Sequence, residues 1–220
     1  MPLTRALSSA ALAGLALAVV LILGLTLFVS DVDPVRRTIS EYGLQPEYRT
    51  IFDMGVLAFA AACVLVAAAL PRAGIAGWGA ATGLGVAALG LATVVVFEKT
   101  DWSVGPSLGG SIHRYASLVA FLVLPVAAIV AARGHRGAHA AWSRWLGVAS
   151  LAWFLPIVAG FALRPVTGRS WWQTIPLGLV ERGLALTEVL TVAALAIWGL
   201  AASRAVAGAP AGAVPERSVR

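Results

Sequence analysis

The chain has 220 residues, of which 60% are hydrophobic and only 12% charged, and its net charge is +6. A soluble domain is about 25% charged, whereas the apolar residues here fall into blocks of about twenty, the length that crosses the hydrocarbon core of a bilayer. This composition excludes an ordinary soluble domain. The positive charge comes from arginines scattered among short loops, without the basic face of a nucleic-acid-binding module, so we expect no nucleic-acid partner.

The apolar blocks predict an all-α membrane protein, a bundle of six transmembrane helices within residues 1–204. We expect the spans at about residues 10–28, 51–70, 75–97, 113–132, 144–163 and 182–202. A signal peptide is the alternative for the first block, but its apolar core would be only about 7–15 residues long. Residues 205–220, rich in Ala, Gly and Pro, are expected to form a disordered tail.

Prolines and glycines predict the details of three spans. Pro125 and Pro156 predict kinks in the fourth and fifth spans, because proline removes a backbone donor inside a helix. Gly79 and Gly83 stand four residues apart in the third span. Small residues at this spacing let helix backbones approach closely, which favours an interior position for this span.

Topology places the three long connections, at about 31–50, 98–112 and 164–181, on the side opposite the termini. Lys and Arg divide equally between the two sides, but nine of the ten acids lie on the long-connection side. We therefore expect cytoplasmic termini in a multi-pass protein of the plasma (inner) membrane. The preference for Arg over Lys, together with many Ala and Gly residues, suits a GC-rich bacterial genome.

Most side chains capable of acid–base or ligand chemistry gather on this long-connection side. Glu181 and Glu188 lie about two turns apart on one helical face. Asp53 and Glu188 fall inside spans, where an ionisable group costs about 2–3 kcal/mol unless it is paired or wetted, so both are site candidates. The alternative is that either carboxylate pairs with Arg49, Arg114 or Arg182 and only locks helices together.

His113 is the one histidine near these acids. A hydrolase with His113, Ser117 and an aspartate is conceivable, but the chain has no GxSxG motif. A metal site needs three or four converging ligands, and His135 and His139 lie on the other side, so we expect no metal and no cofactor. The commonest outcome for such a histidine is a hydrogen bond to Asp101 or to a loop carbonyl.

Three segments resemble domain-of-unknown-function family 998, six-span membrane proteins of bacteria and archaea. They are residues 38–43 (Thr-Ile-Ser-Glu-Tyr-Gly), Asp101 ahead of residues 110–113 (Gly-Ser-Ile-His), and residues 178–182 (Gly-Leu-Val-Glu-Arg). The resemblance covers about residues 8–203, and residues 98–100 (Glu-Lys-Thr) depart from the family pattern. It implies the six-span architecture and assigns no reaction. The polar signature positions that it implies are Ser40, Glu41, Asp101, His113, Glu181 and Arg182.

Three functions remain compatible with the sequence. The first is a polar pocket on the extracytoplasmic face that binds a lipid headgroup or small amphiphile from the surrounding bilayer. The second is a membrane-embedded lipid hydrolase or transferase that uses His113 with Asp101 or Glu181, and the third is a non-catalytic accessory or assembly subunit. A transporter would need a two-half pattern, which a homo-oligomer could supply. The candidate binding residues are Ser40, Glu41, Asp53, Asp101, His113, Arg114, Glu181, Arg182 and Glu188.

Overall fold

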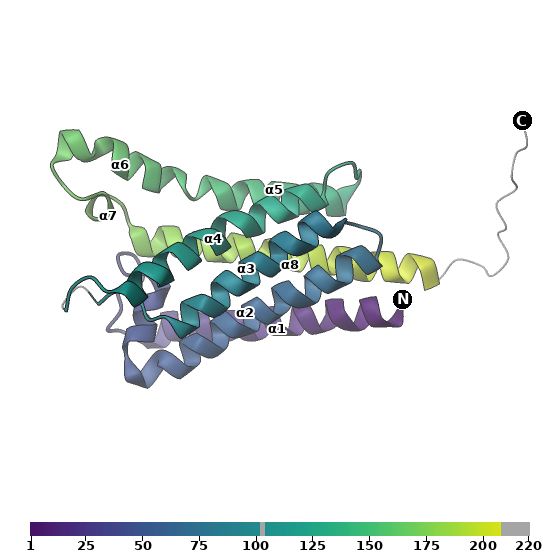
Figure 1. Cartoon of the computed structure of the whole chain (residues 1–220), viewed down its shortest axis with the longest axis horizontal. Helices are drawn as coiled ribbons and strands as arrows, with labels where there is room; N and C mark the ends of the chain where they lie inside the picture. Colours follow the sequence, from purple (N-terminus) through teal and green to yellow (C-terminus); the bar gives the residue numbers. More distant parts are fainter. Residues whose placement is uncertain (102–103, 208–220) are drawn as a thin grey trace, which may run out of the picture.

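The protein is a bundle of long helices joined by short turns at one end and longer connections at the other (Figure 1). The structure, a computed structural model, describes residues 1–101 and 104–207. Its elements are α1 (Pro2–Phe28), η1 (Ile39–Leu44), α2 (Pro46–Arg72), α3 (Trp78–Val96), α4 (Leu108–Ala131), α5 (Ala138–Ala152), α6 (Leu155–Thr167), α7 (Trp171–Thr174) and α8 (Leu177–Ala207).

The predicted fold class is confirmed. Six helical segments are long and apolar enough to cross a membrane: α1, α2, α3, α4, the α5–α6 pair and α8. No strand occurs among the residues that the structure describes. The first helix of the bundle starts and the last one ends on the same side (Figure 1), as an even number of spans requires. Most of the predicted tail, residues 208–220, lies outside the described residues, while α8 continues to Ala207.

Several helices begin earlier than the apolar blocks suggest. Pro2 and Pro46 stand in the first turns of α1 and α2. Proline is favoured at this place because its fixed φ suits a helix and the first N–H groups have no intrahelical partner. At α4, the Ser107 side chain accepts a hydrogen bond from the Gly110 N–H at 2.9 Å and caps the helix. Local capping chemistry, rather than hydropathy, therefore sets these helix starts.

The fifth span is broken rather than merely kinked. α5 ends at Ala152 and α6 begins at Leu155, just before Pro156, whereas α4 runs through Pro125 without interruption. The break brings the Trp153 ring against Gly183 of α8, where a Cβ would collide with the ring. Beyond the break, α6 leans away from the other helices (Figure 1).

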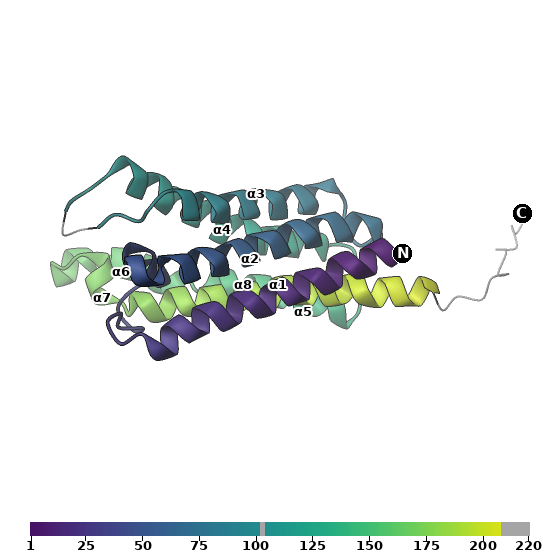
Figure 2. The same cartoon turned by 90° about the horizontal axis from the view of Figure 1, so that it is seen from below.

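Small residues hold α3 against α4, as predicted, but the predicted interior position of this span is wrong: α3 packs mainly against α2 and α4 and lies at one edge of the bundle (Figure 2). A Cβ on Gly83 would lie 2.8 Å from the Ala127 Cβ, and one on Gly90 would lie 2.8 Å from the Ala116 carbonyl oxygen. At Gly79 no atom lies within 4 Å of such a Cβ, so only half of the predicted glycine pair makes the contact. On the other face of the bundle, α1 and α8 pack side by side (Figure 2).

Candidate functional site

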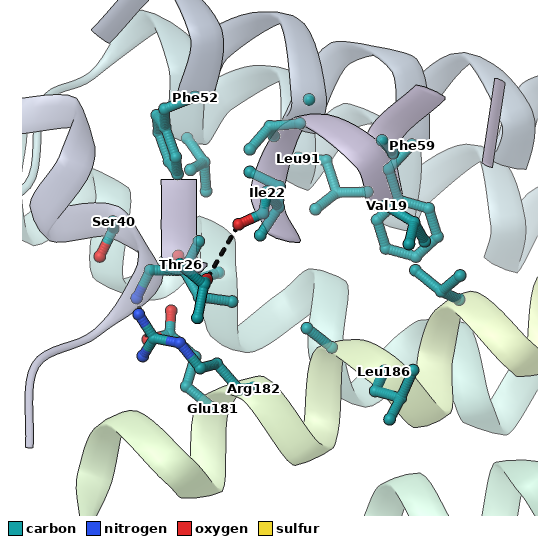
Figure 3. Close-up of a pocket in the computed structure, with 18 of the residues that line it drawn as sticks. Val19, Ile22, Thr26, Ser40, Phe52, Phe59, Leu91, Glu181, Arg182 and Leu186 are labelled. Atoms are coloured by element: carbon teal, nitrogen blue, oxygen red, sulfur yellow. Dashed lines mark hydrogen bonds between the residues drawn. The ribbon is translucent and has the colours of Figure 1, made fainter. Parts of the chain in front are cut away.

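A cavity of about 330 Å³ lies inside the bundle toward the end that carries η1 (Figure 3). This volume falls at the lower end of the range of small-ligand pockets, about 300–1,000 Å³. Most of the wall is apolar and comes from five helices. The apolar wall residues are Ala18, Val19, Ile22, Leu23, Phe52, Gly55, Val56, Phe59, Leu91, Val94, Phe121, Ala185, Leu186 and Val189, together with Ile39 of η1.

The cavity reaches the outside of the bundle between α1 and α8. Val19 and Leu23 of α1 and Leu186 of α8 line it and are also 36%, 49% and 56% exposed. All three lie within membrane-spanning segments. The opening is therefore lined by exposed apolar side chains of membrane-spanning helices.

Polar groups gather at the η1 end of the cavity. Ser40 of η1 and Glu181 and Arg182 of α8 line it there, and Figure 3 shows them grouped at one end. His113 and Ser117 of α4 also line the cavity. Four of the residues singled out in the sequence (Ser40, His113, Glu181 and Arg182) are thus brought together around one cavity.

Glu181 ties η1 to α8. Its Oε2 accepts a hydrogen bond from the Ile39 backbone N–H at 2.8 Å. Ile39 is the first residue of η1, and the first N–H groups of a helix have no partner within it. The carboxylate therefore satisfies a backbone donor and fixes the position of η1 over the cavity.

Arg182 holds the segment before η1. One guanidinium nitrogen (Nη1) donates to the carbonyl oxygens of Pro34 at 2.9 Å and Arg37 at 2.7 Å, and Nη2 lies 3.3 Å from the Tyr42 hydroxyl. One turn earlier on α8, a Cβ on Gly178 would lie 2.7 Å from the Pro34 carbonyl oxygen. The glycine lets residues 34–37 approach α8 closely enough for Arg182 to reach their carbonyls.

Glu41 lies outside the cavity wall and forms an ion pair instead. The Lys99 ammonium hydrogen-bonds to the Glu41 carboxylate and donates to the Thr38 hydroxyl at 2.7 Å. A guanidinium nitrogen of Arg37 lies 3.8 Å from the same carboxylate. Lys99, which departs from the family pattern, therefore joins the α3–α4 connection to η1.

Asp53 forms an ion pair with an arginine, which was the alternative to a role in a binding site. An Arg49 nitrogen lies 3.6 Å from the Asp53 carboxylate, and the same guanidinium pairs with Glu98. Asp53 is not part of the cavity wall. The Arg49–Asp53 pair lies within α2, and it is the Arg49–Glu98 pair that links α2 to the end of α3.

His113 is held by carbonyls at the end of α3. Its Nδ1 lies 2.8 Å from the Phe97 oxygen and 3.2 Å from the Val94 oxygen. A carbonyl oxygen only accepts, so Nδ1 carries the proton and Nε2 of the neutral ring keeps its lone pair. Asp101 and Arg114 are exposed and lie outside the cavity wall.

Glu188 lies deeper, beyond the cavity wall. Its side chain is fully buried, and neither carboxylate oxygen has a hydrogen-bond partner among the residues that the structure describes. The sequence identified this residue as a candidate, but the structure separates it from Glu181 and the cavity.

The apolar wall of the cavity could not be derived from the sequence in detail. Among the described residues, no group of three or more His, Cys, Asp or Glu side chains is placed to hold a metal ion. The apolar wall was missed because each wall residue resembles any other apolar residue of a membrane span. Thr26, whose hydroxyl donates to the Ile22 oxygen at 2.9 Å, also lines the cavity and was missed.

Comparison with known proteins finds one family. The model of the family described as "Protein of unknown function (DUF998)" matches residues 11–198. No curated protein and no solved structure matches the chain.

Proposed function

The chain belongs to the DUF998 family, whose description assigns no activity, and we propose that it binds a single-chain lipid or similar amphiphile in the cavity between α1 and α8. The observation that carries the proposal is the cavity itself, with an apolar wall inside the membrane-spanning segments and polar groups at one end. An acyl chain would occupy the apolar part, and its headgroup would lie against Ser40, Glu181 and Arg182. Ligand sites commonly combine such a wall with a few polar groups that fix orientation.

The opening between α1 and α8 supports a ligand that comes from the bilayer. Leu23 and Leu186 at the opening are exposed and apolar. On the connection side, Glu181, Arg182 and Lys99 fasten η1 and the segment before it over the polar end. A membrane-dissolved amphiphile could therefore enter sideways without leaving the apolar phase, whereas a water-soluble ligand would have to displace these contacts.

Matched leucine variants on α8 test the proposal. Leu186 lines the cavity and is 56% exposed, while Leu190, one turn further, is 44% exposed and lies outside the wall. The protein is purified in lipid nanodiscs, and its retained lipids are identified by native mass spectrometry after release. Leu186→Trp should lose the bound amphiphile and Leu190→Trp should keep it. Equal lipid retention in wild type and both variants would refute the proposal.

The distribution of acids also bears on the orientation of the protein in the membrane. We propose that the termini lie in the cytoplasm and that the polar end of the cavity faces the outer side of the plasma membrane, because the acids and the long connections lie together on that side. A green fluorescent protein fused to the C-terminus should then be fluorescent, and an alkaline phosphatase fused there should be inactive. The reverse pattern would contradict this orientation.

The enzyme and accessory-subunit hypotheses stay predictions. In a catalytic His–carboxylate pair, the carboxylate orients the ring through Nδ1. Here Nδ1 of His113 is bound to backbone carbonyls of α3 instead. This arrangement favours binding over catalysis.

A further inference from the structure

We infer that the headgroup bound at the polar end of the cavity is an uncharged hydroxyl, as in a long-chain alcohol or a monoacylglycerol, rather than a phosphate, a carboxylate or an ammonium group. This inference rests on the proposed amphiphile binding and specifies its ligand class. It follows from the charge balance of the cavity wall, from the hydrogen bonds that Arg182 already makes, and from the acceptors that remain.

The polar end carries no net charge. Glu181 and Arg182 are adjacent in the chain, have opposite charge, and are the charged side chains that line the cavity. With His113 neutral, their formal charges cancel. An ionic headgroup placed there would lose its hydration inside a membrane-spanning bundle without an opposite charge to replace it.

The guanidinium of Arg182 is already engaged. Carboxylate and phosphate recognition by arginine typically uses two parallel N–H donors. Here Nη1 donates to the carbonyls of Pro34 and Arg37, and Nη2 is directed to the Tyr42 hydroxyl. The other parallel edge of the guanidinium, Nε with Nη2, is not open to the cavity, because Nε is buried and Nη2 is directed to the Tyr42 hydroxyl. An anionic headgroup could therefore obtain this fork only by moving Arg182.

The polar end offers a ligand mostly acceptors. Ser117 Oγ, which lines the cavity, donates to the His113 carbonyl oxygen at 2.8 Å and keeps its own lone pairs. Nε2 of His113 keeps a lone pair because Nδ1 carries the proton, and Glu181 uses only Oε2 to bind Ile39. A hydroxyl is both donor and acceptor, so its proton can go to the carboxylate or the imidazole while its oxygen accepts from the Ser40 hydroxyl. A dianionic phosphate would bring only acceptors to a site in which acceptors predominate.

Probes with identical chains and different headgroups test this inference. Dodecanol, dodecanoate, dodecyl phosphate and dodecylammonium are titrated against the purified full-length protein in nanodiscs, and each dissociation constant is measured by displacement of a fluorescent alkyl alcohol. We expect dodecanol to bind about tenfold more tightly than each charged probe, the difference expected when one polar group is left unpaired. Equal or tighter binding of any charged probe would overturn the headgroup inference while leaving the proposed amphiphile binding intact. No binding of any probe would overturn both.

A charge variant gives a second, independent readout. Glu181→Gln keeps an oxygen that can accept from the Ile39 N–H but makes the cavity wall net positive. It should strengthen dodecyl phosphate binding about tenfold relative to dodecanol. The control, Glu41→Gln, removes a neighbouring carboxylate that is outside the cavity wall and should leave the ratio unchanged. An unchanged ratio in Glu181→Gln, or the same shift in both variants, would contradict the charge-balance reasoning.

Discussion

Replacing Glu188 by methionine is expected to stabilise the protein. The side chain has 0% exposure within the bundle, and neither oxygen has a hydrogen-bond partner among the described residues. Burying a polar group without such a partner costs about 1–3 kcal/mol in proteins, and more if the group is ionised. Methionine is similar in length and unbranched, and it adapts to irregular space, so Glu188→Met should recover about 1–3 kcal/mol.

Thermal unfolding of the purified protein in detergent measures this effect. For a chain of this size each kcal/mol changes the melting temperature by about 2–4 °C, so Glu188→Met should raise it by at least about 2 °C. Glu188→Gln keeps an unpaired polar group and should change it little. Glu181→Met is the matched control and should lower the melting temperature, because it leaves the Ile39 N–H without its acceptor.

The two glutamates therefore should respond in opposite directions to the same substitution. A fall in melting temperature for Glu188→Met comparable to that for Glu181→Met would refute the reasoning. It would show that the Glu188 carboxyl makes a stabilising interaction in the folded protein, and that its burial is compensated.

Three further substitutions test the packing and the connection side, each by the melting temperature of the purified protein. Gly90→Ala should destabilise by about 1–3 kcal/mol, because its Cβ would lie 2.8 Å from the Ala116 oxygen, while Gly85→Ala, with no atom within 4 Å, should be neutral or slightly stabilising. Equal effects would contradict the assigned α3–α4 contact. Lys99→Ala should lower the free energy of unfolding by about 1.5–3 kcal/mol, because it removes a partly buried charged hydrogen bond. Arg49→Ala, at an exposed ion pair, should lower it by less than about 1 kcal/mol. A larger loss for Arg49→Ala than for Lys99→Ala would contradict this ranking. Gly178→Ala should lower the melting temperature and speed amide hydrogen exchange in residues 34–37, since its Cβ would displace the Pro34 carbonyl. Unchanged exchange would show that the close approach is dispensable.

The spans were predictable because a bilayer imposes a length on every helix that crosses it. The six apolar blocks each correspond to a helical span. The broken fifth span was less predictable. Pro156 indicated a kink, but the structure ends α5 at Ala152 and packs the Trp153 ring against Gly183, thirty residues further along the chain. Such a contact between distant segments leaves no local signal in hydropathy.

The candidate site was predictable in its polar half only. Ser40, His113, Glu181 and Arg182 stand out in an apolar chain because polar groups near a span need a reason to be there. A void between helices leaves no such signal, since it depends on how side chains from five helices fail to fill the space between them. The partner of Glu41 was also missed, because Lys99 comes from a connection whose path over η1 cannot be read from its own residues.

The first turns of α8 couple the cavity to the connection above it. Glu181 and Arg182 line the cavity, and the same two side chains bind the Ile39 N–H and the Pro34 and Arg37 carbonyls. These partners are backbone groups, which any residue would supply except proline at position 39, and only the Tyr42 hydroxyl adds a side-chain partner. The specificity of this docking therefore lies in α8 rather than in the connection. Under the proposed amphiphile binding, a headgroup that drew Arg182 away from the Pro34 and Arg37 carbonyls would also release the segment before η1. The contacts that determine headgroup specificity would then be the same contacts that keep the cavity covered.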